Sequence, residues 1–170
     1  VCFREDLYQR WDAYGYRLWP SRAVQQTYDG PPARVVTYRS NSDGFRTRER
    51  QVVDGRTRIV VLGDSLTFGI GVEAEERFTE RIEAVEPSWR VDNLGMIGFG
   101  PDLMLRSLEA VGLEPAPKVV VMALFTDDLN NDGVKNGLAW LLGAANPSAN
   151  SCGLLPQASH TPAGKLVLKF

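Results

Sequence analysis

Residues 59 to 69 read Ile59-Val-Val-Leu-Gly-Asp-Ser-Leu-Thr-Phe-Gly69. The first four residues are apolar without alternation, which is typical of a strand buried on both faces of a parallel sheet. Ser65 follows the end of this strand, and open parallel sheets bind ligands at the carboxyl ends of their strands. Ser65 is therefore expected where a substrate can reach it. A serine at the start of a helical turn also suits an N-cap, so two roles are open: helix cap and nucleophile.

The segments after this stretch alternate between helical and strand patterns. A helix is predicted over residues 74–86, with Phe78, Ile82 and Val85 on its apolar face. Further along, the pattern predicts a strand over 89–93, a helix over 101–111 and a third buried strand over 118–124. Strands and helices that alternate in this way indicate an α/β fold with a parallel sheet and right-handed connections.

The two ends of the chain differ from this middle part. Residues 1–57 are rich in Tyr, Trp and Arg, and are expected to form an irregular arm with one or two short strands, such as Arg34–Arg39. Its aromatic side chains are expected to pack on the main domain, residues 58–170. From about residue 127 the pattern becomes atypical, with a short helix predicted over 134–143 and a terminal strand over 166–170.

Composition sets the broad class of protein. The 170 residues suit one domain, and 44% hydrophobic with 24% charged residues is usual for a globular protein. A net charge of -2 predicts no broad attraction to nucleic acid, and no apolar run reaches the roughly 18 residues that a membrane span needs. The chain begins at Val1, and no leader is visible. Cys2 and Cys152 are compatible with one disulfide or with two free thiols.

Four blocks of the chain carry motifs in a fixed order. The first block is Ile59–Val72, the second Asp92-Asn-Leu-Gly-Met-Ile-Gly98, and the third Val119–Asp128, with Asn41-Ser-Asp-Gly-Phe-Arg46 upstream of them. Taken together, they resemble the SGNH/GDSL hydrolase family over residues 35–128. In secreted and periplasmic members of that family, a segment similar to Asn41–Arg46 often precedes the first block. The resemblance implies a three-layer, flavodoxin-like sandwich, and a secreted or periplasmic protein.

The same resemblance implies a site. In the family, the serine of the first block attacks an ester carbonyl. The oxyanion is held by the serine's own N–H, by the second-block glycine N–H and by a third-block asparagine. Carried over, Ser65 is the nucleophile, Gly98 an oxyanion donor, and Asp64 the acidic neighbour of Ser65 in the site. The implied substrates are small acyl esters, including acetylated carbohydrate, and no cofactor is required.

Two departures from the family pattern concern the remaining parts of the site. Asp127 stands where the family has its donor asparagine, and an ionised carboxylate only accepts hydrogen bonds. His160 is the one histidine, and so the histidine candidate for the base; the alternative is an ordinary loop histidine. The aspartate that the family places three residues earlier is Gln157. The connection from the third block to His160 is also short, so the sandwich is expected to be truncated at its C-terminal end.

The acidic run after Phe125 suggests a metal site. Asp128, Asn130, Asp132 and Asn136 fit the oxygen positions of a calcium loop, with Gly133 at its turn. The twelfth position, usually a glutamate, is Ala139. The segment also resembles calcium-loop cassettes near the C-termini of secreted bacterial proteins. The alternative is a solvated Asp/Asn turn without metal.

Two functions remain open on the sequence. One is a serine esterase or acyltransferase acting on small acyl esters. The other is a non-catalytic, calcium-stabilised secreted module on a degenerate SGNH scaffold. The intact first and second blocks favour the enzyme, whereas Asp127 and Gln157 favour the module.

Overall fold

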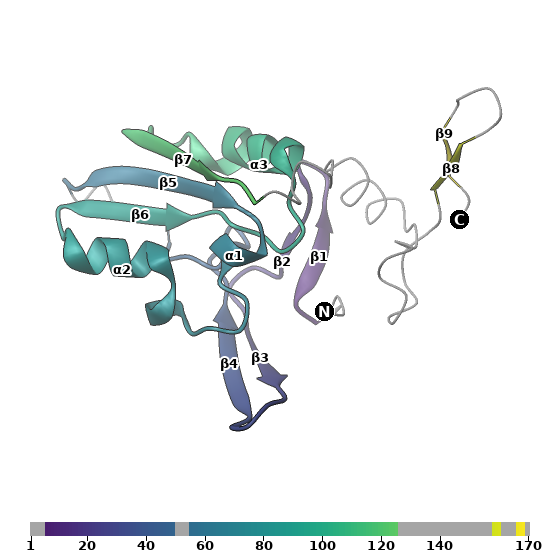
Figure 1. Ribbon diagram of the computed structural model, residues 1–170. Helices are drawn as coiled ribbons and strands as arrows, with labels where there is room; N and C mark the ends of the chain where they lie inside the picture. The colour runs from purple at the N-terminus through teal and green to yellow at the C-terminus, as the bar shows by residue number, and fades with distance from the viewer. Residues whose placement is uncertain (1–5, 50–54, 126–157, 161–165, 169–170) are drawn as a thin grey trace.

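The computed structural model describes residues 6–49, 55–125, 158–160 and 166–168, with the last two ranges described as backbone only (Figure 1). In chain order its elements are β1 (Tyr8–Trp11), β2 (Gly15–Leu18), β3 (Ala23–Tyr28), β4 (Arg34–Arg39), β5 (Thr57–Gly63), α1 (Ser65–Phe68), the 3-10 turn η1 (Ala74–Glu76), α2 (Phe78–Val85), β6 (Trp89–Asn93), α3 (Pro101–Ser107), the π-helical turn η2 (Leu108–Gly112), β7 (Val119–Ala123), β8 (Ala158–His160) and β9 (Leu166–Leu168).

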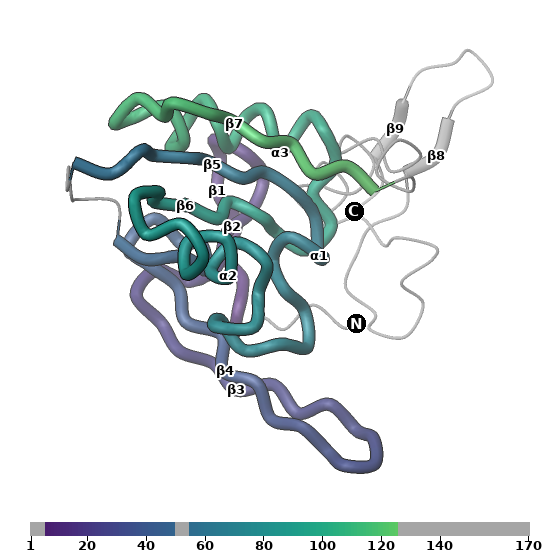
Figure 2. Tube along the Cα trace, turned by 60° about the vertical axis from the view of Figure 1, so that its left-hand side comes forward, coloured from purple at the N-terminus to yellow at the C-terminus, as the bar shows by residue number. Residues whose placement is uncertain are grey.

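A parallel sheet in the order β6-β5-β7 organises the main domain. Ile59 of β5 pairs with Val91 of β6 on one side and with Val119 of β7 on the other, and both pairings are parallel. Helix α2 lies on one face of the sheet and α3 on the other (Figures 1 and 2). The predicted α/β fold and its three adjacent parallel strands are therefore confirmed, and the described part is consistent with a truncated flavodoxin-like sandwich.

Strand β5 is buried on both faces, as its unbroken apolar run predicts. Val60 and Leu62 belong to the main core cluster, together with Leu103 and Met104 of α3. Ile59 and Val61 point to the opposite face, where they form a smaller cluster with a residue of β6, Val91. This alternation follows from the two-residue period of a strand. It fixes the direction in which the chain leaves the sheet at Gly63.

The N-terminal segment is more regular than predicted. Instead of an irregular arm, residues 8–39 contain two antiparallel hairpins, β1–β2 and β3–β4. Figure 1 shows β3–β4 extending away from the sheet. The buried aromatic side chains of this segment belong to the same core cluster as Val60 and Phe68; they are Tyr8, Tyr14, Tyr16, Tyr38 and Phe45. Segment and sheet thus share one hydrophobic core.

Helix α2 buries a different face from the predicted one. Phe78, Ile82 and Val85 are 41%, 38% and 85% exposed, whereas Thr79 and Glu83 are buried. Hydrogen bonds of the two polar side chains explain why this face is buried. The Thr79 hydroxyl accepts a hydrogen bond from Asn93 Nδ2 at 2.9 Å. The Glu83 carboxylate accepts one from Arg48 at 2.6 Å. The prediction of an apolar inner face was wrong because specific bonds to distant segments set the helix rotation.

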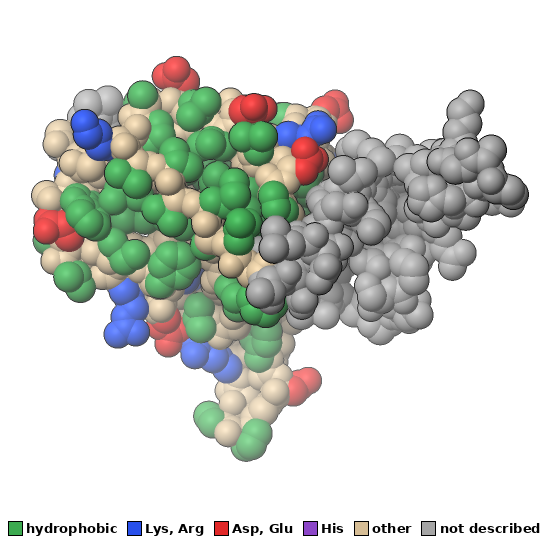
Figure 3. Space-filling view, turned by 45° about the horizontal axis from the view of Figure 1, so that its top comes forward, with side chains coloured by type: hydrophobic (Ala, Val, Ile, Leu, Met, Phe, Trp, Pro, Cys, Tyr) green, Lys and Arg blue, Asp and Glu red, His purple; other side chains and the backbone are tan. Residues whose placement is uncertain are grey.

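Strand β7 forms as predicted, but it is not buried. Its residues Val119 to Met122 are between 41% and 43% exposed, and within the described residues β7 pairs with β5 alone. Figure 3, which brings the β7 side of the molecule forward, shows hydrophobic side chains gathered over this face. An apolar strand normally has a covering layer on each face. Among the described residues, β7 lacks a second strand neighbour.

The remaining predictions concern the chain ends. Strands β8 and β9 form an antiparallel pair, in which His160 lies opposite Leu166. The predicted helix over 134–143 and both cysteines, Cys2 and Cys152, lie outside the described residues. Within the described part of the chain, every helix is too short or too polar to cross a membrane.

Candidate active site

Ser65 is the first residue of α1, a single helical turn that begins directly after the central strand. Figures 1 and 2 show α1 at the end of β5. Ser65 is partly exposed, and its hydroxyl lies 3.4 Å from Asp64 Oδ2. The cap of this turn is Asp64, whose Oδ1 accepts a hydrogen bond from the Leu66 N–H at 2.9 Å. The helix-cap role considered for Ser65 therefore belongs to Asp64, while the Ser65 hydroxyl donates a long hydrogen bond to Asp64 Oδ2.

The second block is held against this turn by Asn93. Its side chain is fully buried at the end of β6. Asn93 Nδ2 donates to the Thr67 carbonyl oxygen of α1 at 2.7 Å and to Thr79 Oγ1 at 2.9 Å, while Oδ1 accepts from the Gly95 N–H at 2.9 Å. One amide group thus joins α1, α2 and the loop after β6. A buried amide that makes three hydrogen bonds fixes its neighbours because each unmade bond would be costly.

Gly95 and Met96 bring the loop into direct contact with the serine turn. A Cβ at Gly95 would lie 2.5 Å from the Phe68 backbone nitrogen and 2.7 Å from Thr67 Cβ, so only glycine fits. The Met96 N–H donates to the Gly63 carbonyl oxygen at 3.1 Å. Gly63 stands two residues before Ser65, and Gly98 two residues after Met96. This hydrogen bond therefore fixes the loop that leads to Gly98 to the end of β5.

Gly98 has the backbone conformation that a non-glycine residue rarely adopts, with φ of +81°. The carbonyl before it, of Ile97, accepts a hydrogen bond from the Tyr16 hydroxyl at 2.5 Å. Burial raises the pKa of Tyr16, so this donor keeps its proton. Within the described residues, the backbone N–H groups of Ser65 and Gly98 make no hydrogen bond. Backbone N–H groups that are free of other bonds are the kind of donor that can stabilise an oxyanion.

The structure therefore holds the loop after β6 against the serine turn at Gly95 and Met96. It also adds residues to which sequence reasoning gave no role: Asn93 and Thr67 join the loop to the turn, and Tyr16 secures the loop from the N-terminal segment. Asn93 lies in a recognised block, so its position was marked even though its bonds were not. Nothing in the local sequence around Tyr16 indicates its contact, because Ile97 lies 81 residues away along the chain.

Other predicted site residues lie outside the described residues. These are Asp127 and the calcium-loop residues Asp128, Asn130, Asp132 and Asn136. His160 is described only as a backbone position in β8. Its proposed pairing with Ser65 therefore stays a prediction. Within the described part of the chain, no three His, Cys, Asp or Glu side chains gather in a way that could hold a metal ion.

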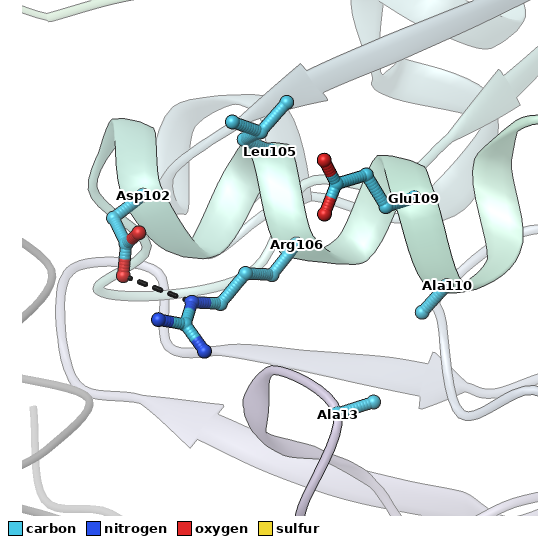
Figure 4. A pocket seen from close by; sticks show the side chains of 6 residues that line it. All are labelled: Ala13, Asp102, Leu105, Arg106, Glu109 and Ala110. Carbon is cyan, nitrogen blue, oxygen red and sulfur yellow. Dashed lines mark hydrogen bonds and ion pairs between the residues drawn. The ribbon is translucent and has the colours of Figure 1, made fainter.

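A shallow hollow of about 490 Å³ lies elsewhere, between the β1–β2 turn and the outer side of the α3–η2 segment (Figure 4). An ion pair between Arg106 and Asp102, 3.2 Å long, crosses part of its wall. Ala13, Leu105, Glu109 and Ala110 complete the lining. Neither Ser65 nor Gly98 contributes to it, so this hollow is separate from the serine turn.

No protein-family model matches the chain, and no curated protein matches it. Among solved structures, it is similar to AlinE4, described as an SGNH-hydrolase family esterase, with 22% identity and a TM-score of 0.41 over 54% of this chain and 53% of that one. It is also similar to TesA, with 22% identity and a TM-score of 0.40 over 55% and 54%. The chain thus spans about half the length of these structures.

Proposed function

We propose that this chain is a serine esterase or acyltransferase of the SGNH/GDSL type, in which Ser65 Oγ attacks the carbonyl carbon of a small acyl ester. The observation that carries this is a partly exposed Ser65 beside the Gly98 loop, with both backbone N–H groups unused in the described residues. Attack places negative charge on the carbonyl oxygen. Two fixed N–H donors stabilise that charge, because they need no reorganisation as it develops.

The reaction then has two halves. Ser65 Oγ forms a bond to the acyl carbon, its proton passes to a base, and the alcohol part of the ester leaves as an acyl-enzyme forms. Water or a second alcohol takes up the acyl group in the second half, which makes the outcome hydrolysis or transfer. We assign the base to His160, because it is the one histidine of the chain.

Two residues of the sequence are expected to lower turnover. Asp127 replaces the neutral donor of the third block, and an ionised carboxylate there repels the oxyanion. Loss of one oxyanion donor typically reduces turnover about 100- to 1000-fold. Gln157 supports an imidazolium by hydrogen bonding only, without charge. We therefore expect the enzyme to be slow, and Asp127→Asn, which restores the donor, should raise its turnover.

The substrate class in this proposal is a small ester, such as an acetyl group on a carbohydrate. A secreted or periplasmic location belongs to the same proposal, because it rests on the likeness of Asn41–Arg46 to segments of such proteins.

A chromogenic acetyl ester tests the function directly. The full 170-residue chain should hydrolyse it without added metal, and Ser65→Ala should abolish the reaction. Ser88→Ala is the matched control, because Ser88 is exposed and its hydroxyl donates a hydrogen bond to the neighbouring Glu86 carboxylate. Hydrolysis that survives in Ser65→Ala, or that disappears equally in Ser88→Ala, would contradict the assignment of Ser65.

A second function is favoured by Asp127 and Gln157: a non-catalytic module stabilised by calcium through Asp128, Asn130, Asp132 and Asn136. Oxygen ligands at alternate positions suit this cation. On this proposal, the melting temperature should rise with calcium and fall with a chelator, without any change in ester hydrolysis. Equal melting temperatures in the two conditions would remove the calcium hypothesis.

A further inference from the structure

Arg46 is the last residue of the segment Asn41–Arg46, and its side chain is almost fully buried, 2% exposed. Its guanidinium group reaches the carboxyl end of the turn that Ser65 begins. Nη1 donates to the carbonyl oxygens of Phe68 at 3.2 Å and Gly69 at 2.8 Å, and Nη2 donates to that of Val72 at 2.8 Å. The last carbonyls of a helix lack partners within it, and a cation suits that end. Arg46 therefore satisfies the free end of α1.

The loop that carries Arg46 is itself fixed by Asn41. The Asn41 Oδ1 atom accepts hydrogen bonds from the N–H groups of Asp43 at 3.1 Å and Phe45 at 2.9 Å, and its Nδ2 donates to the Arg48 carbonyl at 3.2 Å. Phe45 is fully buried and packs on Tyr14, with ring centroids 5.5 Å apart. The segment Asn41–Arg46 is thus a closed loop anchored in the core by Phe45, and it directs the Arg46 guanidinium group toward the end of α1.

Aromatic rings hold the guanidinium plane in place. Its central carbon lies 4.4 Å from the ring centroid of Tyr38 and 5.5 Å from that of Phe68. Burial, and then the nearby charge of Arg77, lower the pKa of Arg46 to about 10, so the group remains charged at neutral pH. The planar guanidinium group of arginine can donate to several separate acceptors at once, whereas the ammonium group of lysine carries its three donors on one nitrogen atom. These contacts select arginine specifically.

We propose that Arg46 is a positioning residue for the nucleophile: by holding the carboxyl end of α1, it fixes the orientation of the Ser65 hydroxyl at its other end. This inference rests on the proposed function of Ser65, but it adds a role that the serine and oxyanion blocks do not contain. α1 has four residues, so a shift at Phe68 is transmitted to Ser65 within a single turn. Arg46 acts through α1 and does not itself contact the substrate.

The test uses Arg46→Lys and Arg46→Met, with Arg106→Lys as the matched control. Arg106 is exposed and pairs with Asp102 on α3. Both Arg46 variants should lower kcat for the chromogenic ester about 10- to 100-fold with KM unchanged, the effect expected of a misaligned nucleophile. Arg46→Lys should recover less than a tenth of wild-type kcat, because it cannot serve the separate carbonyls. Each kcat is expressed per folded molecule, measured from the unfolding transition.

Wild-type kcat in Arg46→Lys overturns the proposal, and so does a rise in KM alone, which would indicate substrate binding instead. Amide hydrogen exchange separates this proposal from the proposed function. The Phe68, Gly69 and Ile70 N–H groups, which bond to Asp64 and Ser65 carbonyls, should exchange faster in Arg46→Lys than in Arg106→Lys. If the wild-type chain hydrolyses no ester, the esterase proposal falls, and unchanged exchange would then overturn the role of Arg46 as well.

Discussion

Replacement of Gly95 by alanine should damage the candidate site more than the fold. An added Cβ would lie 2.5 Å from the Phe68 backbone nitrogen, and real Cβ contacts do not fall below 3.0 Å. The loop and α1 must therefore separate by at least 0.5 Å, the difference between these two distances. Overpacking of this kind costs about 1–3 kcal/mol. A gain of about 0.4–1 kcal/mol from the less flexible unfolded chain offsets part of it. The two ranges leave a net loss between about 0 and about 2.6 kcal/mol in the free energy of unfolding, and we expect the middle of it, about 1.3 kcal/mol.

The same displacement should have a larger effect on catalysis. Because a misplacement of about 1 Å can reduce a rate about 100-fold, a shift of half that size should lower kcat about 10-fold. Gly30→Ala is the matched control, because a Cβ there would have its nearest atom, Pro32 O, at 3.9 Å. It should be neutral or slightly stabilising. Denaturant unfolding and ester hydrolysis measure the two effects. Wild-type stability and kcat in Gly95→Ala would refute the close contact between the loop and the serine turn.

Two further predictions concern the core. Asp92→Asn should lower the free energy of unfolding by about 3–5 kcal/mol, because it leaves the buried guanidinium groups of Arg58 and Arg90 without their shared counter-charge. The control is Asp102→Asn, which removes an exposed ion pair and should cost less than about 1 kcal/mol. Equal losses in the two variants would contradict the buried network. Burial raises the pKa of Tyr16, so only the unfolded chain releases this proton near pH 10. The stability it contributes is complete below that pH and declines above it. The denaturant midpoint should fall between about pH 8 and about pH 11, and it should fall less in Tyr16→Phe than in the wild-type protein. An equal fall in the two proteins would contradict this prediction.

The sequence predicted those features that depend on local pattern. Strand β6 occupies Trp89–Asn93 as expected, because Pro87 ends the preceding helix and the turn of the second block begins at Gly95. The order of strands and helices around Ser65 follows in the same way, since each segment carries its own periodicity. The position of Ser65 after the central strand is the part of the candidate site that this reasoning reached.

Features that depend on distant partners were not predictable. Helix α2 turns Thr79 and Glu83 inward because of Asn93 and Arg48, and no helical pattern within residues 78–85 contains that information. The three acceptors of Arg46 at the end of α1 and just beyond it lie 22 to 26 residues further along the chain. The exposure of β7 was not predictable for the same reason. An apolar strand sequence indicates that the strand can be buried, but it does not identify the element that would pack on it.

Covalent labelling of the nucleophile tests the central claim most directly. A serine-directed phosphonate is incubated with the full chain, and the modified residue is located by mass spectrometry of its peptides. The account predicts one adduct, on Ser65, that forms more slowly in Gly95→Ala and is absent in Ser65→Ala. No adduct on the wild-type chain, or an adduct on another serine such as Ser88, would contradict it.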